Sequence, residues 1–425
     1  MARIMLEAMP FTGHVTPIAA VASELVARGN DVRFYTGSAF QGRVEASGAR
    51  FVPWRVAPDF DENDMQATFP RLVGKKGLGQ LLINVADVMI GTAPAQVDDL
   101  RSEWEREPWD VIAMDELSVG AAFFAEQRGG AWATVSVLPL NLSGTSGPPS
   151  GMGLAPGTNV VTRTRDAALR ALVPMFSRPL TKPLARARAA VGLPPATRTF
   201  DQTVFSPALV VASGVPLLDF ERPDRPPHVQ FVGELAHTTR AAQPEVDPPP
   251  WWGDLDGRTV VHVTQGTFNI DPTNLLRPAL EALADVDAIV VATSGVPGRD
   301  SLPFPVPRNA RVAGFVPYAR LLPRVDVVVT NGGWGGVLAA LAHDIPLVIA
   351  GGDLDKPEIA ARVAWARAGV NLRTGTPTAA QVRAGFDRVA GDRSFRDAAA
   401  RVGAQLRSLG GAPRAAELIE ALAPP

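Results

Sequence analysis

The sequence predicts an α/β protein built from two parallel-sheet domains that face each other across a cleft. Three observations lead to this prediction: a strand–helix–strand pattern at the start, the same pattern in the second half, and a proline-rich stretch between them. With 425 residues, 46% of them apolar and 20% charged, each half can bury a core of its own. We therefore expect a first domain at 1–213, a linker at 214–253 and a second domain at 254–425, with the last helix free to return to the first domain.

The first unit occupies residues 3–37. The apolar run RIMLEAM ends at Pro10, and the helical segment TPIAAVASELVARG follows, with Thr16 as N-cap, Pro17 at the first helical position and Gly29 closing it. DVRFYTG then alternates like a strand. The pattern recurs around 110–138, in DVIAMDE, SVGAAFFAEQRG and AWATVSVL. Strands joined through helices imply parallel pairing.

The chain changes character between residues 214 and 253. Eight prolines fall in this stretch and no helical period survives, which is typical of a linker. Beyond it, RTVVHVTQG, PTNLLRPALEALA and DAIVVATSG again read as strand, helix and strand, and the tail from Ala379 reads as helical. Ligands of such sheets bind beyond the carboxyl ends of the strands, which places the expected site in the cleft between the domains.

Charge and cysteine content exclude several classes of protein. A net charge of −2 gives no reason to expect nucleic acid or an anionic membrane as a partner. Without cysteine there is no disulfide, thiolate metal site or thiol nucleophile. The N-terminus does not read as a signal peptide, and no run of 18 uncharged apolar residues is present. We expect a cytoplasmic protein, either a monomer or a homodimer.

Two residues of the first half are candidates for proton transfer. His14 lies in PFTGHVTP, in the predicted loop between the first strand and the first helix, and histidine titrates near neutral pH. Asp115 ends the apolar run VIAMD, so its carboxylate could fix the tautomer of His14 and stabilise the imidazolium. The structural alternatives are a solvent-exposed or helix-capping histidine and an aspartate at the start of the next helix.

In the second half, TNGGWGGVLAALAH places glycines between a strand and a helix. Free N–H groups and the positive end of the helix dipole favour a phosphate there, although a tight structural turn is the alternative. The spacing matches neither G-x-G-x-x-G nor a P-loop, which disfavours NAD and ATP. Asp353 and Asp355 in GDLDKPE superficially resemble a metal clamp. Because the helix start already compensates phosphate charge, we expect no metal, and recognition of hydroxyl groups by Asp355 or Lys356.

Taken together, these motifs resemble the nucleotide-sugar glycosyltransferases of the GT-B fold, which has two Rossmann-like domains. The most similar groups are the UGT-like enzymes and the bacterial macrolide and antibiotic glycosyltransferases, and the likeness covers nearly the whole chain. GHVTP resembles the family's Gly-His-x-x-Pro motif, which implies that His14 is the catalytic base. AMDEL resembles the strand end that carries the partner aspartate, here Asp115.

The resemblance also assigns donor-binding residues in the second half. TQGTFN is similar to the first donor loop, with Gly266 and Thr267. GFVPY matches the segment beside the nucleotide base, which implies that Phe315 stacks on the base and Val316 binds it through its backbone. The glycine-rich segment and the acidic segment after it resemble the donor signature, which adds Asn331, Gly333, Trp334, Gly335, Gly336, Asp355 and Lys356.

Three positions depart from the family pattern. Asn331 replaces a histidine and can donate a hydrogen bond to phosphate, but not a charge-assisted one. Lys356 stands where an amide usually follows the aspartate. Ala339 replaces the glutamate that holds the ribose hydroxyls, which favours a TDP-sugar over a UDP-sugar because deoxyribose lacks the 2′-hydroxyl. The same change also permits relaxed donor choice or loss of activity.

The resemblance implies an inverting, metal-independent transfer of a sugar from a TDP- or UDP-sugar to a hydroxyl of a hydrophobic natural-product aglycone, with no cofactor beyond the nucleotide-sugar. The apolar segments 78–91 and 137–147 suggest the acceptor side, although core packing alone would account for the first. Two alternatives remain open: a non-catalytic nucleotide-sugar-binding auxiliary protein and a sugar-nucleotide epimerase on the same fold. A nicotinamide oxidoreductase is disfavoured because the dinucleotide fingerprint is missing.

Overall fold

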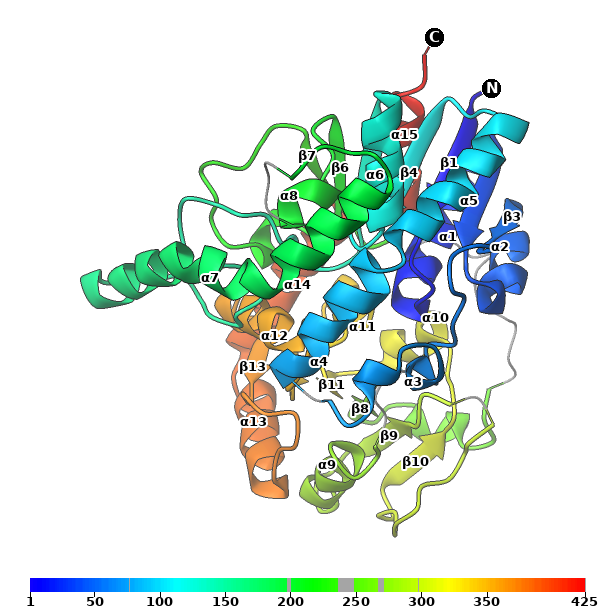
Figure 1. Ribbon diagram of the computed structural model, residues 1–425. Helices are drawn as coiled ribbons and strands as arrows, with labels where there is room; N and C mark the ends of the chain where they lie inside the picture. Colours follow the sequence, from blue (N-terminus) through cyan, green and yellow to red (C-terminus); the bar gives the residue numbers. More distant parts are fainter. Residues whose placement is uncertain (76, 197–199, 236–247, 267–270, 297, 425) are drawn as a thin grey trace.

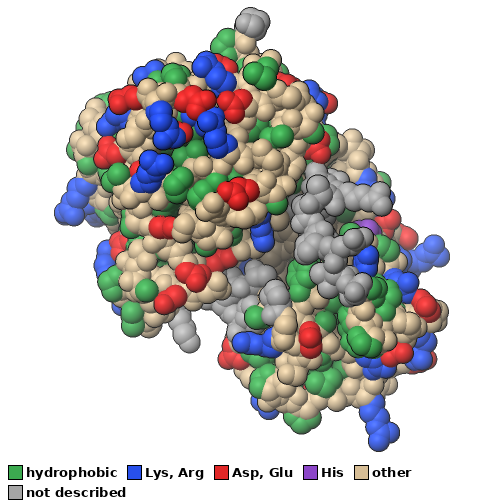
Figure 2. Space-filling view, turned by 90° about the vertical axis from the view of Figure 1, so that its right-hand side faces the viewer, with side chains coloured by type: hydrophobic (Ala, Val, Ile, Leu, Met, Phe, Trp, Pro, Cys, Tyr) green, Lys and Arg blue, Asp and Glu red, His purple; other side chains and the backbone are tan. Residues whose placement is uncertain are grey.

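The computed structural model describes residues 1–425 except 76, 197–199, 236–247, 267–270, 297 and 425. It contains a seven-stranded sheet of order β3-β2-β1-β4-β5-β6-β7 and a six-stranded sheet of order β10-β9-β8-β11-β12-β13, both with parallel pairing between neighbouring strands (Figure 1). The predicted class, two parallel-sheet α/β domains, is confirmed. The space-filling view shows two lobes with the surface hollowed between them (Figure 2).

The first sheet and its helices come mainly from the first half of the chain. Its strands are β1 (Arg3–Glu7), β2 (Asp31–Thr36), β3 (Arg50–Pro53), β4 (Val111–Asp115), β5 (Trp132–Ser136), β6 (Leu209–Ser213) and β7 (Val229–Gly233). The helices are α1 (Thr12–Ala27), α2 (Gln41–Ala46), α3 (Met65–Thr68), α4 (Gly77–Ile83), α5 (Ala93–Arg106), α6 (Val119–Arg128), α7 (Val160–Ala190) and α8 (Phe200–Val204). Shorter turns are η1 (Ser38–Phe40), η2 (Pro70–Leu72), the π-helical η3 (Asn84–Ile90) and η4 (Pro216–Leu218).

The second sheet follows the connection. Its strands are β8 (Val260–Thr264), β9 (Ile289–Thr293), β10 (Ala310–Ala313), β11 (Val327–Thr330), β12 (Leu347–Ile349) and β13 (Gly369–Asn371). The helices are α9 (Leu276–Ala282), α10 (Tyr318–Leu321), α11 (Trp334–Ala342), α12 (Lys356–Trp365), α13 (Ala379–Gly391), α14 (Arg393–Ser408) and α15 (Gly411–Glu420), with η6 (Trp252–Leu255) and η7 (Leu322–Arg324) between them. Among the described helices, none combines the length and the apolar character needed to cross a membrane.

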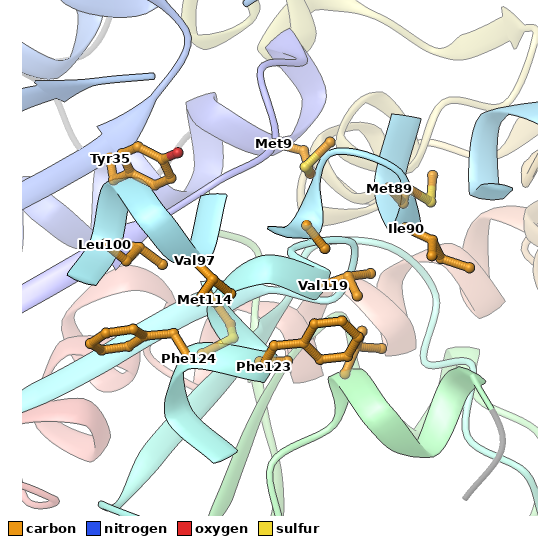
Figure 3. Close-up of a cluster of buried hydrophobic side chains, with 14 of the residues drawn as sticks. Met9, Tyr35, Met89, Ile90, Val97, Leu100, Met114, Val119, Phe123 and Phe124 are labelled. Carbon is orange, nitrogen blue, oxygen red and sulfur yellow. The ribbon is translucent and has the colours of Figure 1, made fainter. Parts of the chain in front are cut away.

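Both faces of the first sheet are buried, as expected for parallel strands covered by helices on two sides. On one face, residues of β1 and β4 pack against α5 and α6, and Figure 3 shows Met114, Val97, Phe123 and Phe124 among these side chains. On the other face, the sheet packs against α1 and the C-terminal helix α15, which contributes Ile419. These two cores hold the carboxyl ends of β1 and β4 at fixed positions.

The last helix lies on the first domain. α15 packs along α1, and Glu420 accepts hydrogen bonds from Arg28 Nε at 2.8 Å and Asn30 Nδ2 at 2.9 Å. The predicted domain boundary at residue 213 is too early, because β7 adds a seventh strand to the first sheet from within the predicted linker. Its residues Val229 and Val232 are buried, which gives this part of the proline-rich stretch a reason to be ordered.

The first helix begins earlier than the sequence predicts, and this matters for the site. α1 starts at Thr12 instead of Pro17, the predicted first helical residue, so Pro17 lies inside it and His14 belongs to its first turn rather than to a loop. The Glu62 carboxylate accepts the Thr12 N–H at 2.9 Å and so caps the helix start. Pro17 lacks an N–H, but that loss leaves only the Gly13 carbonyl without its helical donor.

Candidate active site

His14 and Asp115 meet at the carboxyl edge of the first sheet. His14 lies in the first turn of α1, and Asp115 ends β4, the strand beside β1. His14 Nδ1 lies 2.9 Å from Asp115 Oδ2, and both side chains are almost fully buried. The structure therefore brings together the two residues that the sequence analysis singled out for proton transfer.

Asp115 is fixed by donors on all sides. Its Oδ2 also accepts the Met9 N–H at 2.9 Å, and its Oδ1 accepts the Leu117 N–H and the Ser118 hydroxyl, both at 2.8 Å. Burial by itself would raise the pKa of Asp115, but the charge and hydrogen bond of His14, together with the bonds from Ser118 and Met9, hold that pKa below its ordinary value. Asp115 is therefore a carboxylate that acts only as an acceptor.

The same pairing sets the properties of His14. Burial disfavours the imidazolium, yet the Asp115 charge and its hydrogen bond outweigh burial and raise the pKa of His14, with smaller contributions from Glu116 and Asp355. Asp115 requires a proton on Nδ1, which assigns the neutral tautomer and leaves the Nε2 lone pair free. A histidine held in this way is suited to act as a general base.

Two further buried carboxyl groups surround this pair, and the sequence analysis did not identify them. Glu116 accepts the Val137 N–H at 3.0 Å and the Leu138 N–H at 2.8 Å, and burial raises its pKa to about 7. Glu7, at the end of β1, is fully buried, and burial with the nearby Asp115 charge raises its pKa well above the ordinary value. Their position in the sequence could have identified them, because each lies at the carboxyl end of a predicted strand, where functional groups of parallel sheets gather.

Aromatic side chains form the surroundings of His14. The half-buried Phe11 ring lies 5.8 Å from the His14 ring and 5.4 Å from the Phe60 ring, measured between centroids. Within the segment 78–91, Val88, Met89 and Ile90 are buried in the core. Core packing therefore accounts for the apolar character of this part of the segment. Apolar surface next to the base therefore comes from Phe11 rather than from these three residues.

Across the cleft, the ends of β8 and β11 carry the first segments predicted to bind the donor. Gly266 has a φ of +77°, and Asn331 donates through Nδ2 to the Gln265 carbonyl, which joins the two loops. A Cβ at Gly266 would lie 3.2 Å from Asn331 Nδ2, and its positive φ would strain any other residue, so both features favour glycine. Thr267, the other residue predicted in this loop, lies outside the described residues.

The start of α11 is open on one side and anchored on the other. Among the described residues, a Cβ added at Gly333 or Gly335 would meet nothing within 4 Å, and the N-cap residue Gly333 makes no side-chain cap hydrogen bond. At Gly336, the nearest atom would be the Tyr318 hydroxyl at 3.7 Å. The first-turn N–H groups have no acceptor within the helix, and together with the dipole they suit an anion.

Trp334 belongs to the anchored side. Its side chain is buried, its indole N–H donates to Ser213 Oγ at 2.9 Å, and its ring packs against Gly214, where a Cβ would come within 2.7 Å. The predicted donor contact of Trp334 is therefore limited to its backbone N–H. Its side chain instead ties the donor helix to the end of β6.

The segment beside the expected base position has one exposed aromatic ring. Phe315 is 46% exposed, which leaves a face available for stacking, whereas Val316 is buried and can offer only backbone groups. Ala339 is buried within α11 and carries no polar group. Ala339 therefore supplies no carboxylate at the position where the family pattern has a glutamate for the ribose.

Asp355 and Lys356 differ in their surroundings. Asp355 precedes α12 and lies close enough to His14 for the charge of each to shift the pKa of the other, although burial is the main reason that the pKa of Asp355 is raised. Lys356 Nζ is buried and lies 2.5 Å from Asp353 Oδ1, so its ammonium group is already paired. Asp355 thus lies within electrostatic reach of His14, while Lys356 pairs with Asp353 and also lowers the pKa of Asp355 through its charge.

Within the described residues, no group of three or more histidine and acidic side chains has a geometry that could hold a metal ion. The site as described joins a histidine base, a carboxylate behind it, an acidic residue opposite, and a helix start suited to phosphate. This combination of fold and site agrees with the class that the motifs resemble, a two-domain enzyme that transfers a sugar from an activated nucleotide donor.

Comparison with known proteins gives the family. The chain is 40% identical to 4'-demethylrebeccamycin synthase of Lentzea aerocolonigenes over 99% of both proteins, and 30% identical to UDP-glucosyltransferase A1 of Starmerella bombicola over 94% of this chain and 88% of that protein. Residues 277–423 match the family model for the C-terminal domain of erythromycin biosynthesis protein CIII-like proteins. The structure of the glycotransferase of kitacinnamycin shares the fold, with a TM-score of 0.74 at 23% identity over the full length of both chains.

The chain therefore belongs to the EryCIII-like nucleotide-sugar glycosyltransferases with the GT-B fold. The resemblance inferred from the motifs is confirmed, and so is the prediction that the protein is a glycosyltransferase that uses a nucleotide-sugar.

Proposed function

We propose that this glycosyltransferase moves a hexose from a TDP- or UDP-sugar to a hydroxyl group of a hydrophobic natural-product aglycone, with inversion at the anomeric carbon and without a metal ion. The observation that supports this most strongly is the His14–Asp115 pair at 2.9 Å, with Asp355 of the other domain close by. A base on one wall and a sugar-binding carboxylate on the other frame a single reaction centre.

In the proposed reaction, the acceptor hydroxyl gives its proton to His14 Nε2. Its oxygen forms a bond to the anomeric carbon from the side of the first domain, while the bond from that carbon to the diphosphate oxygen breaks. Attack opposite the leaving group inverts the configuration. Asp115 stabilises the imidazolium through Nδ1–H without taking the proton.

The departing nucleoside diphosphate carries the negative charge that develops in this step. The open start of α11, with Gly333 and Gly335, offers backbone N–H groups and the helix dipole to that charge. This compensation by the backbone is the reason we propose a metal-independent reaction. Asp355 is placed to bind sugar hydroxyls, and Phe315 to stack on the base.

The donor nucleotide and the acceptor follow from weaker signals. Ala339 offers no carboxylate to a ribose, which favours the deoxyribose of a TDP-sugar. The Phe11 ring near His14 gives an apolar acceptor a surface to contact. The similarity to a rebeccamycin synthase and to erythromycin-type proteins supports a natural-product aglycone. The cytoplasmic location and the monomeric or dimeric state stay predictions.

The test is a transfer assay with TDP-glucose and UDP-glucose against a panel of hydrophobic hydroxylated aglycones. We expect a product heavier by one hexose, with the anomeric configuration opposite to that of the donor in its NMR spectrum. Activity should persist in excess EDTA. An unchanged acceptor together with an isomerised donor sugar would indicate an epimerase instead. Absence of both products across the panel would favour a non-catalytic binding protein.

A further inference from the structure

The loop between β5 and α7 (residues 137–159) spans the distance between the two walls of the site. At its start, Val137 and Leu138 donate their N–H groups to Glu116, the residue next to Asp115. Farther along, the loop contacts α12, the helix preceded by Asp355. The same loop therefore touches the environment of the catalytic base and the helix proposed to bind the donor sugar.

Arg362 of α12 holds the beginning of this loop. Its side chain is 1% exposed and its three donor nitrogens serve three partners. Nη2 donates to the Leu140 carbonyl at 3.0 Å, Nη1 donates to Asp219 in the connection between the domains, and Nε donates to Glu358 at 3.2 Å. A buried guanidinium with its donors matched in this way has a single well-defined position.

Glu358 holds the other end of the loop. Its Oε2 accepts the Gly151 N–H at 3.2 Å and the Gly153 N–H at 3.0 Å, while its Oε1 accepts from Arg362. The backbone fits closely here, because a Cβ at Gly153 would lie 2.8 Å from Pro357. The Glu358 carboxylate is thus shared between the loop of the first domain and the arginine of the second.

We propose that Glu358 and Arg362 form an interdomain clamp that couples binding of the donor sugar at Asp355 to the position of loop 137–159, which borders the acceptor side of the site. Asp355 lies three residues before Glu358, on the same end of one helix, so a sugar that orders this end also orders the acceptors of the Gly151 and Gly153 N–H groups. The inference rests on the proposed function, because it requires the donor sugar to be at Asp355.

Coupling of this kind is reciprocal. If donor binding stabilises the loop, then an acceptor that contacts the loop must strengthen donor binding by the same factor. Glu358 and Arg362 are positioning residues in this account and touch neither substrate. Their effect is expected on the communication between the two substrates rather than on the affinity for the donor alone.

Glu358→Gln tests the clamp from the side of the helix. All partners of Glu358 in the described structure are donors, so the amide group of glutamine must face either the glycine N–H groups or Arg362. Glu103→Gln is the matched control, because the Glu103 side chain is also buried and, within the described residues, also accepts from arginine, here Arg33 at 3.3 Å and Arg106.

Gly153→Ala tests the clamp from the side of the loop and leaves the Glu358–Arg362 pair intact. The added Cβ collides with Pro357 and moves the loop away from α12. Gly129→Ala is the matched control, since Gly129 has a φ of +71° against +64° for Gly153 but meets nothing within 4 Å. If Glu358→Gln fails to fold, this second pair still decides the question.

The experiment measures amide hydrogen exchange of residues 138–153, with and without TDP-glucose or UDP-glucose, whichever binds more tightly. In the unmodified protein and both controls, we expect the donor to slow exchange at Gly151 and Gly153 by about tenfold or more. In Glu358→Gln and Gly153→Ala, we expect donor binding that is weaker by no more than about tenfold, the reciprocal of the lost coupling, and no slowing. Donor binding without slowing in the unmodified protein, or equal slowing in both test variants, would overturn the clamp while leaving the proposed function in place. Failure of both nucleotide-sugars to bind the unmodified protein would contradict the proposed function and the clamp with it.

Discussion

The two walls of the cleft are built in opposite ways. On the first-domain wall, Asp115 accepts four hydrogen bonds and His14 is held against it in one tautomer. On the second-domain wall, as far as the described residues show, the start of α11 has no side-chain cap from its N-cap residue and open space at Gly333 and Gly335. Under the proposed function, the difference teaches that proton transfer would rely on fixed side chains, whereas binding of the diphosphate would rely on exposed backbone. Changes to one wall should therefore alter rate, and changes to the other should alter affinity.

The largest effect is expected from Asp115→Asn. Loss of the carboxylate removes the support for the imidazolium and places an amide among donors, so kcat should fall roughly 10³-fold while the affinity for TDP or UDP stays unchanged. Steady-state kinetics and nucleotide titration measure the two quantities. Asp99→Asn is the control, because Asp99 is also buried and accepts from Tyr35 and three backbone N–H groups. A rate loss of equal size in this control would assign the effect to stability instead.

Glu116, on the first-domain wall, should make the free energy of unfolding of the protein depend on pH. Burial raises its pKa in the folded state to about 7, above the ordinary 4.5, so its contribution to the free energy of unfolding is present below pH 4.5 and is lost as the pH rises to about 7. Glu116→Gln mimics the neutral acid. The difference in unfolding free energy between this variant and the unmodified protein should shift by about 3 kcal/mol across that window, in favour of the variant at high pH. Urea unfolding at several pH values measures it, with the exposed Glu105→Gln as control.

A smaller effect is expected on the second wall from Gly335→Ala. The methyl group meets no atom of the free protein, and alanine favours a helix, so the free energy of unfolding should rise by less than about 1 kcal/mol. The same methyl enters the space proposed for the diphosphate, so affinity for TDP and UDP should fall about tenfold, or 1.4 kcal/mol. Thermal unfolding and calorimetric titration report these opposite changes. Gly42→Ala in α2, also in open space, should leave nucleotide affinity unchanged, and a tenfold loss there would argue against the assignment.

The smallest effect is expected from Phe315→Ala. Because the ring is 46% exposed, its removal should change stability little, while loss of stacking should weaken nucleotide binding about fivefold, close to 1 kcal/mol. Phe315→Trp should retain or improve the affinity. Unchanged affinity in the alanine variant would contradict stacking of the nucleotide base on Phe315.

The fold and the pairing of His14 with Asp115 were accessible from sequence because they depend on local patterns. Strand–helix–strand periodicity is local, and two polar residues at the carboxyl ends of parallel strands meet at one edge of a sheet, as His14 and Asp115 do. The glycine-rich start of α11 was accessible for the same reason. These features needed no knowledge of which distant segments touch.

The errors arose where a distant contact decides the local structure. α1 begins at Thr12 because Glu62 caps it from fifty residues away along the chain, a partner that no cap rule based on neighbouring residues detects. The orientation of the Trp334 side chain depends on Ser213, and the ammonium group of Lys356 is paired with Asp353. α7 was not predicted at all, since it contains Pro174, Pro179 and Pro183, which local rules read as helix breakers.

The division of labour between the two walls is tested most directly by His14→Ala. In one protein preparation, sugar transfer and the Kd for the nucleotide-sugar are both measured. The account predicts a transfer rate about 10³-fold lower, with the Kd unchanged within about twofold, because the base lies on the wall that does not hold the nucleotide. Transfer at the rate of the unmodified protein, or a Kd that weakens in parallel with the rate, would contradict it.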